Sequence, residues 1–201
     1  MLLEINSDNP QPRLIGQVVE ALRQGAVICY PTDTVYGIGC DIFNQKAVKR
    51  IYQLKQRAVG KPFSFICADL KDVSTYAHVS NHGYRLMRKC LPGPYTFVLP
   101  AAKIVPKIMM SKQKTVGIRV PDHRVCMDLV SALGNPILTT SASPDDRDAP
   151  LLIHAYEVEE LFGKVVDYII DCGPLADSEP STVVSLVDET VEILRQGKGV
   201  L

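Results

Sequence analysis

The spacing of hydrophobic positions along the chain changes between a helical period and short continuous runs. Leu14, Val18 and Leu22 recur at intervals of four, which is typical of the buried face of a helix. The apolar runs at 26–30 and 63–68 have the length of buried strands instead. Segments of the two kinds follow one another along the chain, so the pattern predicts an α/β fold with a twisted, mostly mixed open sheet and helices.

Turn residues and helix caps set the limits of the other predicted elements. Strands are predicted at 2–5, 26–30, 63–68, 95–99, 115–121, 136–140, 166–170, 182–187 and 191–194. Helices are predicted from the Asp8-Asn9-Pro10 start to Gly25, to residue 54 before the basic loop, after Asp69, at 81–91, at 107–110, from Asp122 to Gly134 and at 154–162. Residues 144–150 are predicted to be a loop, and no repeat or linker divides the chain, so residues 1–201 are expected to form a single domain.

Charge is unevenly distributed, although the formal net charge is zero. Residues 145–192 contain thirteen Asp or Glu and only two basic residues, whereas 42–68 and 101–121 contain eleven Lys or Arg and no carboxylate. The neutral balance argues against a globally basic nucleic-acid-binding protein. The asymmetry predicts a positive face that is built from two separated segments.

Cysteine spacing and the N-terminal sequence indicate the compartment. The six cysteines are widely spaced, and no Cys-x-x-Cys pair occurs, so we expect buried free thiols rather than disulfides or a zinc site. No apolar run approaches the length of a membrane span, and the first residues lack the pattern of a signal peptide. The sequence therefore predicts a cytoplasmic protein with no membrane association.

Basic residues gather after the helix that ends near residue 54. Lys55, Arg57 and Lys61 precede Pro62, at an expected exposed helix end and on the loop after it. Three cations around one loop can bind a polyanion such as a triphosphate. A solvated basic helix end is the alternative interpretation of the same residues, since a helix C-terminus favours cations.

Hydroxyl and cationic side chains follow or lie in several predicted strands. They are Thr32, Thr34, Thr115, Arg119, Thr139, Ser141, Ser143, Ser181, Thr182 and Arg195. If the strands share one sheet, these groups can converge on one crevice, where they would bind phosphate oxygens or a small zwitterion. A Thr-rich turn closed by Gly37 and Gly39 is the alternative for residues 31–41.

Seven motifs occur together in one order along the chain. They are Pro31-Thr-Asp-Thr-Val-Tyr-Gly, Lys55-x-Arg57 with Lys61-Pro62, Pro92-Gly-Pro-Tyr-Thr, Val116-Gly-Ile-Arg-Val-Pro, Thr139-Thr-Ser-Ala, Ser181-Thr-Val-Val and Arg195-x-Gly. In this order they resemble the YrdC/YciO family, whose best-known members are threonylcarbamoyl-AMP synthases. The resemblance implies a YrdC-like α/β sheet with a positively charged concave face.

The same resemblance implies an adenylation linked to tRNA N6-threonylcarbamoyladenosine modification. The substrates would be L-threonine, bicarbonate and ATP with Mg²⁺, with no protein ligands to the metal, and the partners would be tRNA-modification proteins. The implied catalytic residues are Lys55 and Arg57. The implied ATP-binding residues are Lys55, Arg57, Lys61, Thr115, Ser141, Ser143 and Arg195. The implied threonine-binding residues are Thr32, Arg119, Thr139, Ser181 and Thr182, with Arg119 pairing the carboxylate.

Two positions depart from the pattern of the synthases. Ser143 stands where the synthases usually have asparagine, and Asp33 where many have glutamate. With other features these departures favour the YciO branch of the family. The alternative function is a non-catalytic protein that binds double-stranded RNA through the same basic concave face, which the resemblance also implies.

Overall fold

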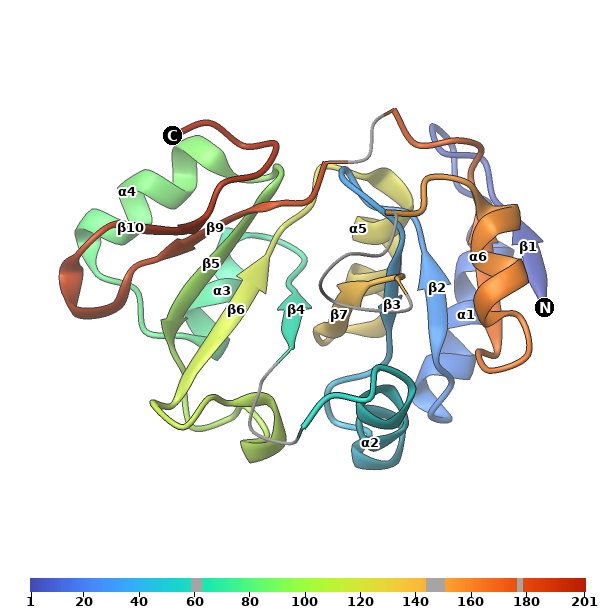
Figure 1. Ribbon diagram of the computed structural model, residues 1–201, viewed down its shortest axis with the longest axis horizontal. Coiled ribbons are helices and arrows are strands. Elements are labelled where there is room, and N and C mark those ends of the chain that lie inside the picture. Colours follow the sequence, from blue (N-terminus) through green and yellow to red (C-terminus); the bar gives the residue numbers. More distant parts are fainter. Residues whose placement is uncertain (59–62, 144–150, 177–178) are drawn as a thin grey trace.

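All ten strands belong to one mixed, open sheet, in the order β1-β8-β2-β3-β7-β4-β6-β5-β9-β10. The computed structural model describes residues 1–58, 63–143, 151–176 and 179–201. Strands β1 and β10 form the two ends of the sheet; α6 lies near the β1 end and α4 near the β10 end (Figure 1). The prediction of a mixed α/β fold with an open sheet is confirmed.

The strands are short and the helices have at most twelve residues. The strands are β1 (Leu2–Glu4), β2 (Ile28–Tyr30), β3 (Gly37–Gly39), β4 (Ser64–Ile66), β5 (Tyr95–Pro100), β6 (Thr115–Arg119), β7 (Ile137–Ser141), β8 (Tyr168–Asp171), β9 (Thr182–Ser185) and β10 (Glu192–Arg195). The helices are α1 (Pro12–Arg23), α2 (Gln45–Leu54), α3 (Leu70–Tyr76), α4 (Asn81–Cys90), α5 (Arg124–Leu133) and α6 (Ala155–Phe162), with 3₁₀ turns η1 (Lys107–Met109) and η2 (Val187–Glu189). None of the described helices has the length and apolar character that crossing a bilayer requires.

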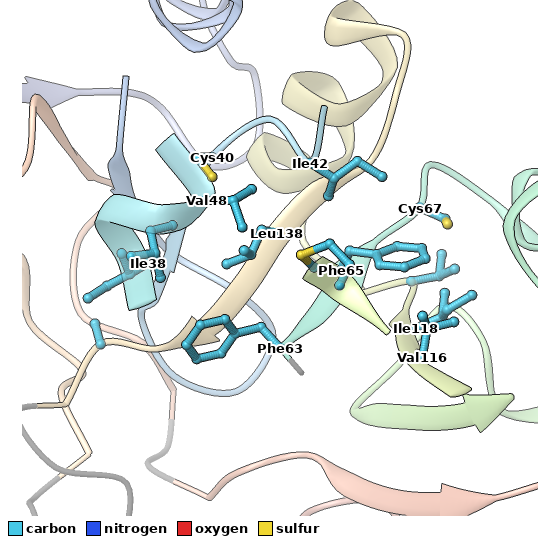
Figure 2. Close-up of a cluster of buried hydrophobic side chains, with 14 of the residues drawn as sticks. Ile38, Cys40, Ile42, Val48, Phe63, Phe65, Cys67, Val116, Ile118 and Leu138 are labelled. Atoms are coloured by element: carbon cyan, nitrogen blue, oxygen red, sulfur yellow. The ribbon is translucent and has the colours of Figure 1, made fainter. Parts of the chain in front are cut away.

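Alternation along the central strands divides the buried side chains between two cores. Ile28 and Tyr30 of β2 join the core under α1 and α5, whereas Cys29 between them joins the larger core that includes α2 and α6. Figure 2 shows part of the larger core, where Val48 of α2 lies close to Leu138 of β7. Each fully buried aliphatic side chain of this kind stabilises the fold by ~1.5–3 kcal/mol.

Two predicted helix starts are wrong by a few residues. The first helix begins at Pro12, not after Asp8, because the Asn6 side-chain oxygen accepts the N–H groups of Asp8 and Asn9 and holds them in a turn. Pro12 then occupies the first helical turn, where its missing N–H has no consequence. Helix α5 follows His123 rather than Asp122. The Asp69 cap is confirmed, since its carboxylate accepts the N–H of Asp72.

Strand β3 was not among the predicted strands. Gly37 and Gly39 form a strand that pairs with β2 and β7, not the closure of a turn. A Cβ at position 39 would lie 2.3 Å from the carbonyl oxygen of Leu138, so only glycine allows this pairing distance. The predicted loop at 144–150 lies outside the described residues.

The six cysteines are free thiols; four of them are buried, as predicted, whereas Cys90 and Cys172 are partly exposed. Burial raises the pKa of Cys29, Cys40, Cys67 and Cys126 far above its usual value, and raises the pKa of Cys172 to about 12. These side chains therefore stay protonated at neutral pH and act as small hydrophobic groups.

Candidate functional site

A cavity of about 570 Å³ opens over the middle of the sheet. Its floor includes Thr139 of β7, Ser64 of β4 and Gly117 of β6, which are direct neighbours in the strand register. A Cβ at position 117 would lie 2.4 Å from the Ser64 hydroxyl, so glycine at this position leaves the space beside Ser64 open. The described residues that line the cavity include three arginines and no carboxylate.

Arg119, at the end of β6, is held by a buried ion pair. Its Nη2 donates to the Asp33 carboxylate at 2.8 Å, and the two side chains are 9% and 8% exposed. The same nitrogen donates to the Thr34 hydroxyl at 3.0 Å. The Arg119 Nε is also buried but has no partner among the described residues. Because Arg119 lines the cavity, a ligand oxygen is the natural acceptor for this N–H.

The turn after β2 presents Asp33 to Arg119. The Thr32 hydroxyl donates to the Val35 carbonyl at 2.7 Å and accepts the N–H of Thr34 at 3.1 Å, so it fixes the turn. The second Asp33 oxygen accepts the N–H of Asp122 at 3.2 Å. Thr32 is not among the cavity-lining residues, and its hydroxyl acts within the turn.

Lys55 is buried, so the expectation of an exposed helix-end lysine is wrong. It lies at the C-cap of α2 and is only 7% exposed. Its ammonium donates to the carbonyl oxygens of Ser143 at 2.8 Å and Ser141 at 3.3 Å, and to the Ser143 hydroxyl at 3.3 Å. The acceptors are thus backbone carbonyls at the end of β7 and just after it. Lys55 therefore joins the end of α2 to the end of β7.

Arg57 lines the cavity two residues further along the chain. Its guanidinium carbon lies 4.8 Å from the centre of the Phe63 ring, a cation–π contact. Phe63 in turn packs against Tyr52 of α2, with ring centres 4.7 Å apart. The aromatic pair thus supports Arg57 at the mouth of the cavity. Lys61 lies outside the described residues.

Ser181 and Arg195 form the wall on the β9–β10 side. The Ser181 and Thr96 hydroxyls are 2.8 Å apart, and Arg195 Nη2 donates to the Ser181 carbonyl at 2.8 Å. Partial burial, and secondly the charge of Arg119, lower the pKa of Arg195. The two guanidinium groups therefore repel each other, and an anion between them would relieve this repulsion. Thr182 points elsewhere, since its hydroxyl donates to the Gly199 carbonyl at 2.6 Å.

Most of the sequence-predicted site residues do meet at this cavity. Those that line it are Arg57, Thr115, Arg119, Thr139, Ser141, Ser143, Ser181 and Arg195. Lys55, Thr32 and Thr182 lie behind the lining and hold other parts of the chain in place. Ser64, Thr96 and the ion-pairing role of Asp33 are functional features that are not apparent from the sequence pattern. For Asp33 the signal was its place between two threonines directly after a buried strand.

A protein-family model, described as telomere recombination and covering Sua5, YciO and YrdC, matches residues 20–197. The chain belongs to the Sua5/YciO/YrdC family. It is 42% identical to YciO of Escherichia coli over 97% of this chain and 94% of that protein. It is 32% identical to a threonylcarbamoyl-AMP synthase of Vibrio vulnificus, over 91% of this chain and 98% of that one.

Solved structures of the family have the same fold. The crystal structure of E. coli YciO aligns with a TM-score of 0.93 at 40% identity, covering 100% of this chain and 97% of that one. Sua5 of Pyrococcus abyssi, solved with L-threonine, aligns with a TM-score of 0.91 at 28% identity. That match covers 98% of this chain but 57% of the Sua5 chain. The family thus includes enzymes named threonylcarbamoyl-AMP synthase, and the sequence-based resemblance is confirmed.

Proposed function

We propose that this protein forms threonylcarbamoyl-AMP, or a closely related acyl adenylate, from L-threonine, bicarbonate and ATP. The observation that carries the proposal is the donor set of one cavity. Arg119 offers a buried N–H without a described partner, which suits a carboxylate, and Arg57 and Arg195 line the same cavity, where they suit phosphates. The relatives named threonylcarbamoyl-AMP synthase, and a Sua5 structure with L-threonine, support the choice of substrates.

The proposed reaction has two steps, and neither step involves oxidation or reduction. The threonine amine attacks the bicarbonate carbon, so that a C–N bond forms and water leaves. A carbamate oxygen then attacks the α-phosphorus of ATP; the new P–O bond forms while the bond to the β-phosphate breaks, and pyrophosphate leaves. Both steps gather anions in one place, so the enzyme contributes mainly orientation and charge stabilisation.

Each sequence-predicted residue that lines the cavity has a role in this scheme. Arg119 binds the threonine carboxylate, with the Thr139 and Ser181 hydroxyls beside it. Arg57 and Arg195 bind the phosphates, and Thr115, Ser141 and Ser143 serve the nucleotide. Lys55, Thr32 and Thr182 do not contact the ligands in this scheme; they hold backbone carbonyls behind the cavity lining. Lys61 is assigned to phosphate binding, as the family resemblance implies.

Magnesium would enter with ATP as its counter-ion. The described lining offers no carboxylate to hold a metal directly, so phosphate oxygens would be its main ligands. The acyl adenylate would then pass to proteins that modify tRNA.

Isotope labelling tests the proposal directly. The protein is incubated with ATP, Mg²⁺, L-threonine and ¹³C-bicarbonate, and the products are separated by liquid chromatography and identified by mass spectrometry. We expect a threonine-dependent adenylate that carries the label, together with pyrophosphate. Arg119→Met should abolish the product, whereas Arg124→Met, which changes an exposed arginine paired with Asp128, should not. Absence of the labelled adenylate, together with salt-sensitive binding of double-stranded RNA, would favour the non-catalytic alternative.

A further inference from the structure

The last residues of the chain are fastened to the start of β9 and to β5. The Thr182 hydroxyl accepts the N–H of Gly197 at 3.0 Å and donates to the carbonyl of Gly199, and the Tyr95 hydroxyl donates to the Val200 carbonyl at 2.7 Å. A Cβ at position 197 would lie 2.2 Å from a backbone oxygen, and one at position 199 would lie 2.5 Å from the Tyr95 ring. The segment 196–200, which we call the C-terminal clasp, therefore lies flat against these two strands.

Lys198 is the residue between the two glycines of the clasp. Its backbone N–H donates to the Pro180 carbonyl at 2.9 Å, in the cavity wall. Its side chain leaves this wall, and the ammonium donates to the Asp33 carbonyl at 3.0 Å. Asp33 follows β2 and the clasp follows β10, and six strands separate these two in the sheet order. The contact therefore joins two distant parts of the curved sheet.

Each of the three oxygen atoms of Asp33 has a different partner. Its backbone carbonyl accepts from Lys198, one carboxylate oxygen accepts from Arg119, and the other accepts the N–H of Asp122. A shift of the Asp33 backbone would move the carboxylate that holds the Arg119 guanidinium. The direction of the Arg119 Nε–H, which has no partner among the described residues, would change with it.

We propose that Lys198 is a positioning residue, which holds Asp33 so that the Asp33–Arg119 pair presents the Arg119 N–H to the amino-acid carboxylate. The part of this inference that concerns threonine rests on the proposed function. Lys198 acts through Asp33 and does not line the cavity. Its loss should therefore weaken amino-acid binding and leave ATP binding intact, because Arg57 is supported by Phe63 at another part of the cavity.

The first test needs no ligand. Lys198→Met keeps the stem of the side chain but removes the donor, Lys198→Arg keeps a donor, and Lys89→Met changes an exposed lysine on α4. Amide hydrogen exchange is followed by mass spectrometry on the peptide that spans residues 31–36. We expect faster exchange there in Lys198→Met only. Exchange in Lys198→Met equal to that of the wild-type protein would show that Lys198 does not hold Asp33 and would overturn the proposal.

The second test measures binding of L-threonine and of ATP to the same proteins by calorimetry. A displacement of about 1 Å can cost up to about a hundredfold, so we expect about tenfold weaker threonine binding in Lys198→Met. Lys198→Arg should restore it, and ATP binding should stay unchanged throughout. Faster exchange with wild-type threonine affinity would overturn the link to Arg119, as would equal losses for both ligands. If the wild-type protein binds no threonine, the proposed function fails. The exchange test still shows whether Lys198 holds Asp33.

Discussion

The two ends of the cavity hold their cations in different ways. At one end Arg119 is neutralised by Asp33 in a buried pair, and that pair orients the buried Nε–H of Arg119. At the other end Lys55 and Arg57 lie in a stretch of sequence, 42–68, without any carboxylate. Lys55 is bound by backbone carbonyls and Arg57 stacks on an aromatic ring.

This difference suits the two kinds of ligand in the proposed reaction. A single carboxylate on a small zwitterion needs one directed donor and little net charge around it, which the Asp33–Arg119 pair supplies. A triphosphate carries several negative charges and is bound best where cations are not already paired with carboxylates. The comparison predicts that mutations at the two ends will have effects of different kinds.

The largest expected effect comes from breaking the ion pair at the Arg119 end. Arg119→Met would leave Asp33 buried without its cation, and removing one partner of such a pair typically costs about 3–5 kcal/mol. We expect a loss of this size in the free energy of unfolding, measured by urea titration. The double variant Asp33→Asn, Arg119→Met should recover most of the stability, because the buried charge is gone. A single variant as stable as the wild-type protein would show that the pair is not buried as described.

At the other end, the two basic residues should separate stability from ATP binding. Lys55→Met leaves the carbonyls of Ser141 and Ser143 without their ammonium donor, so we expect a loss of about 1.5–3 kcal/mol in unfolding free energy. Arg57→Met removes from the cavity lining a cation that we propose binds phosphate, so we expect roughly ten- to a hundredfold weaker ATP binding with little loss of stability.

The measurements are urea titration for stability and calorimetry with ATP for binding, and each variant controls for the other. If Lys55→Met is fully stable and loses only ATP affinity, Lys55 binds phosphate after all. If Arg57→Met binds ATP as the wild-type protein does, the phosphate end of the cavity is elsewhere.

The sequence predicts the elements of this fold better than it predicts which polar groups are free. The sequence pattern located every described helix and strand except β3, because Gly37 and Gly39 carry no strand propensity and only the tertiary pairing explains them. It also missed the 3₁₀ turn η2, since the strand predicted at 182–187 ends at Ser185. Lys55 and Arg57 are equivalent in the sequence pattern. Only the tertiary fold, which brings the end of β7 close to the end of α2, decides that Lys55 is buried against carbonyls and that Arg57 lines the cavity.

The motif order pointed to the cavity residues, but not to the contacts between them. The Asp33–Arg119 pair joins residues 86 positions apart, and Lys198 is 165 positions from Asp33. Such contacts depend on sheet order, which local periodicity does not contain. The positive charge of the concave face as a whole stays a prediction.

A smaller effect is expected where the chain departs from the synthases. Ser143 is 3% exposed, lines the cavity and accepts from Lys55. In Ser143→Asn the new side-chain oxygen can still accept from Lys55, while its NH₂ group can donate into the cavity. We expect adenylate formation to rise about tenfold, the value of one net hydrogen bond of ~1.4 kcal/mol. Threonine-dependent pyrophosphate release measures this, with Ser141→Asn as the control; an unchanged or lower rate would show that position 143 does not limit the reaction.

The smallest effect concerns the pH dependence at the Arg119 end. Burial lowers the pKa of His123, which follows Asp122, and the carboxylates of Asp33 and Asp122 oppose this only in part. The folded protein therefore binds a proton at His123 less readily than the unfolded chain, whose histidine has a pKa of about 6.5. Stability should fall as the pH drops below that value, towards the lower pKa of the folded state. His123→Gln should show a shallower loss of stability between about pH 7 and 5 in urea titrations than the wild-type protein. Parallel curves for the two proteins would mean that His123 does not make the Arg119 end of the cavity sensitive to acid.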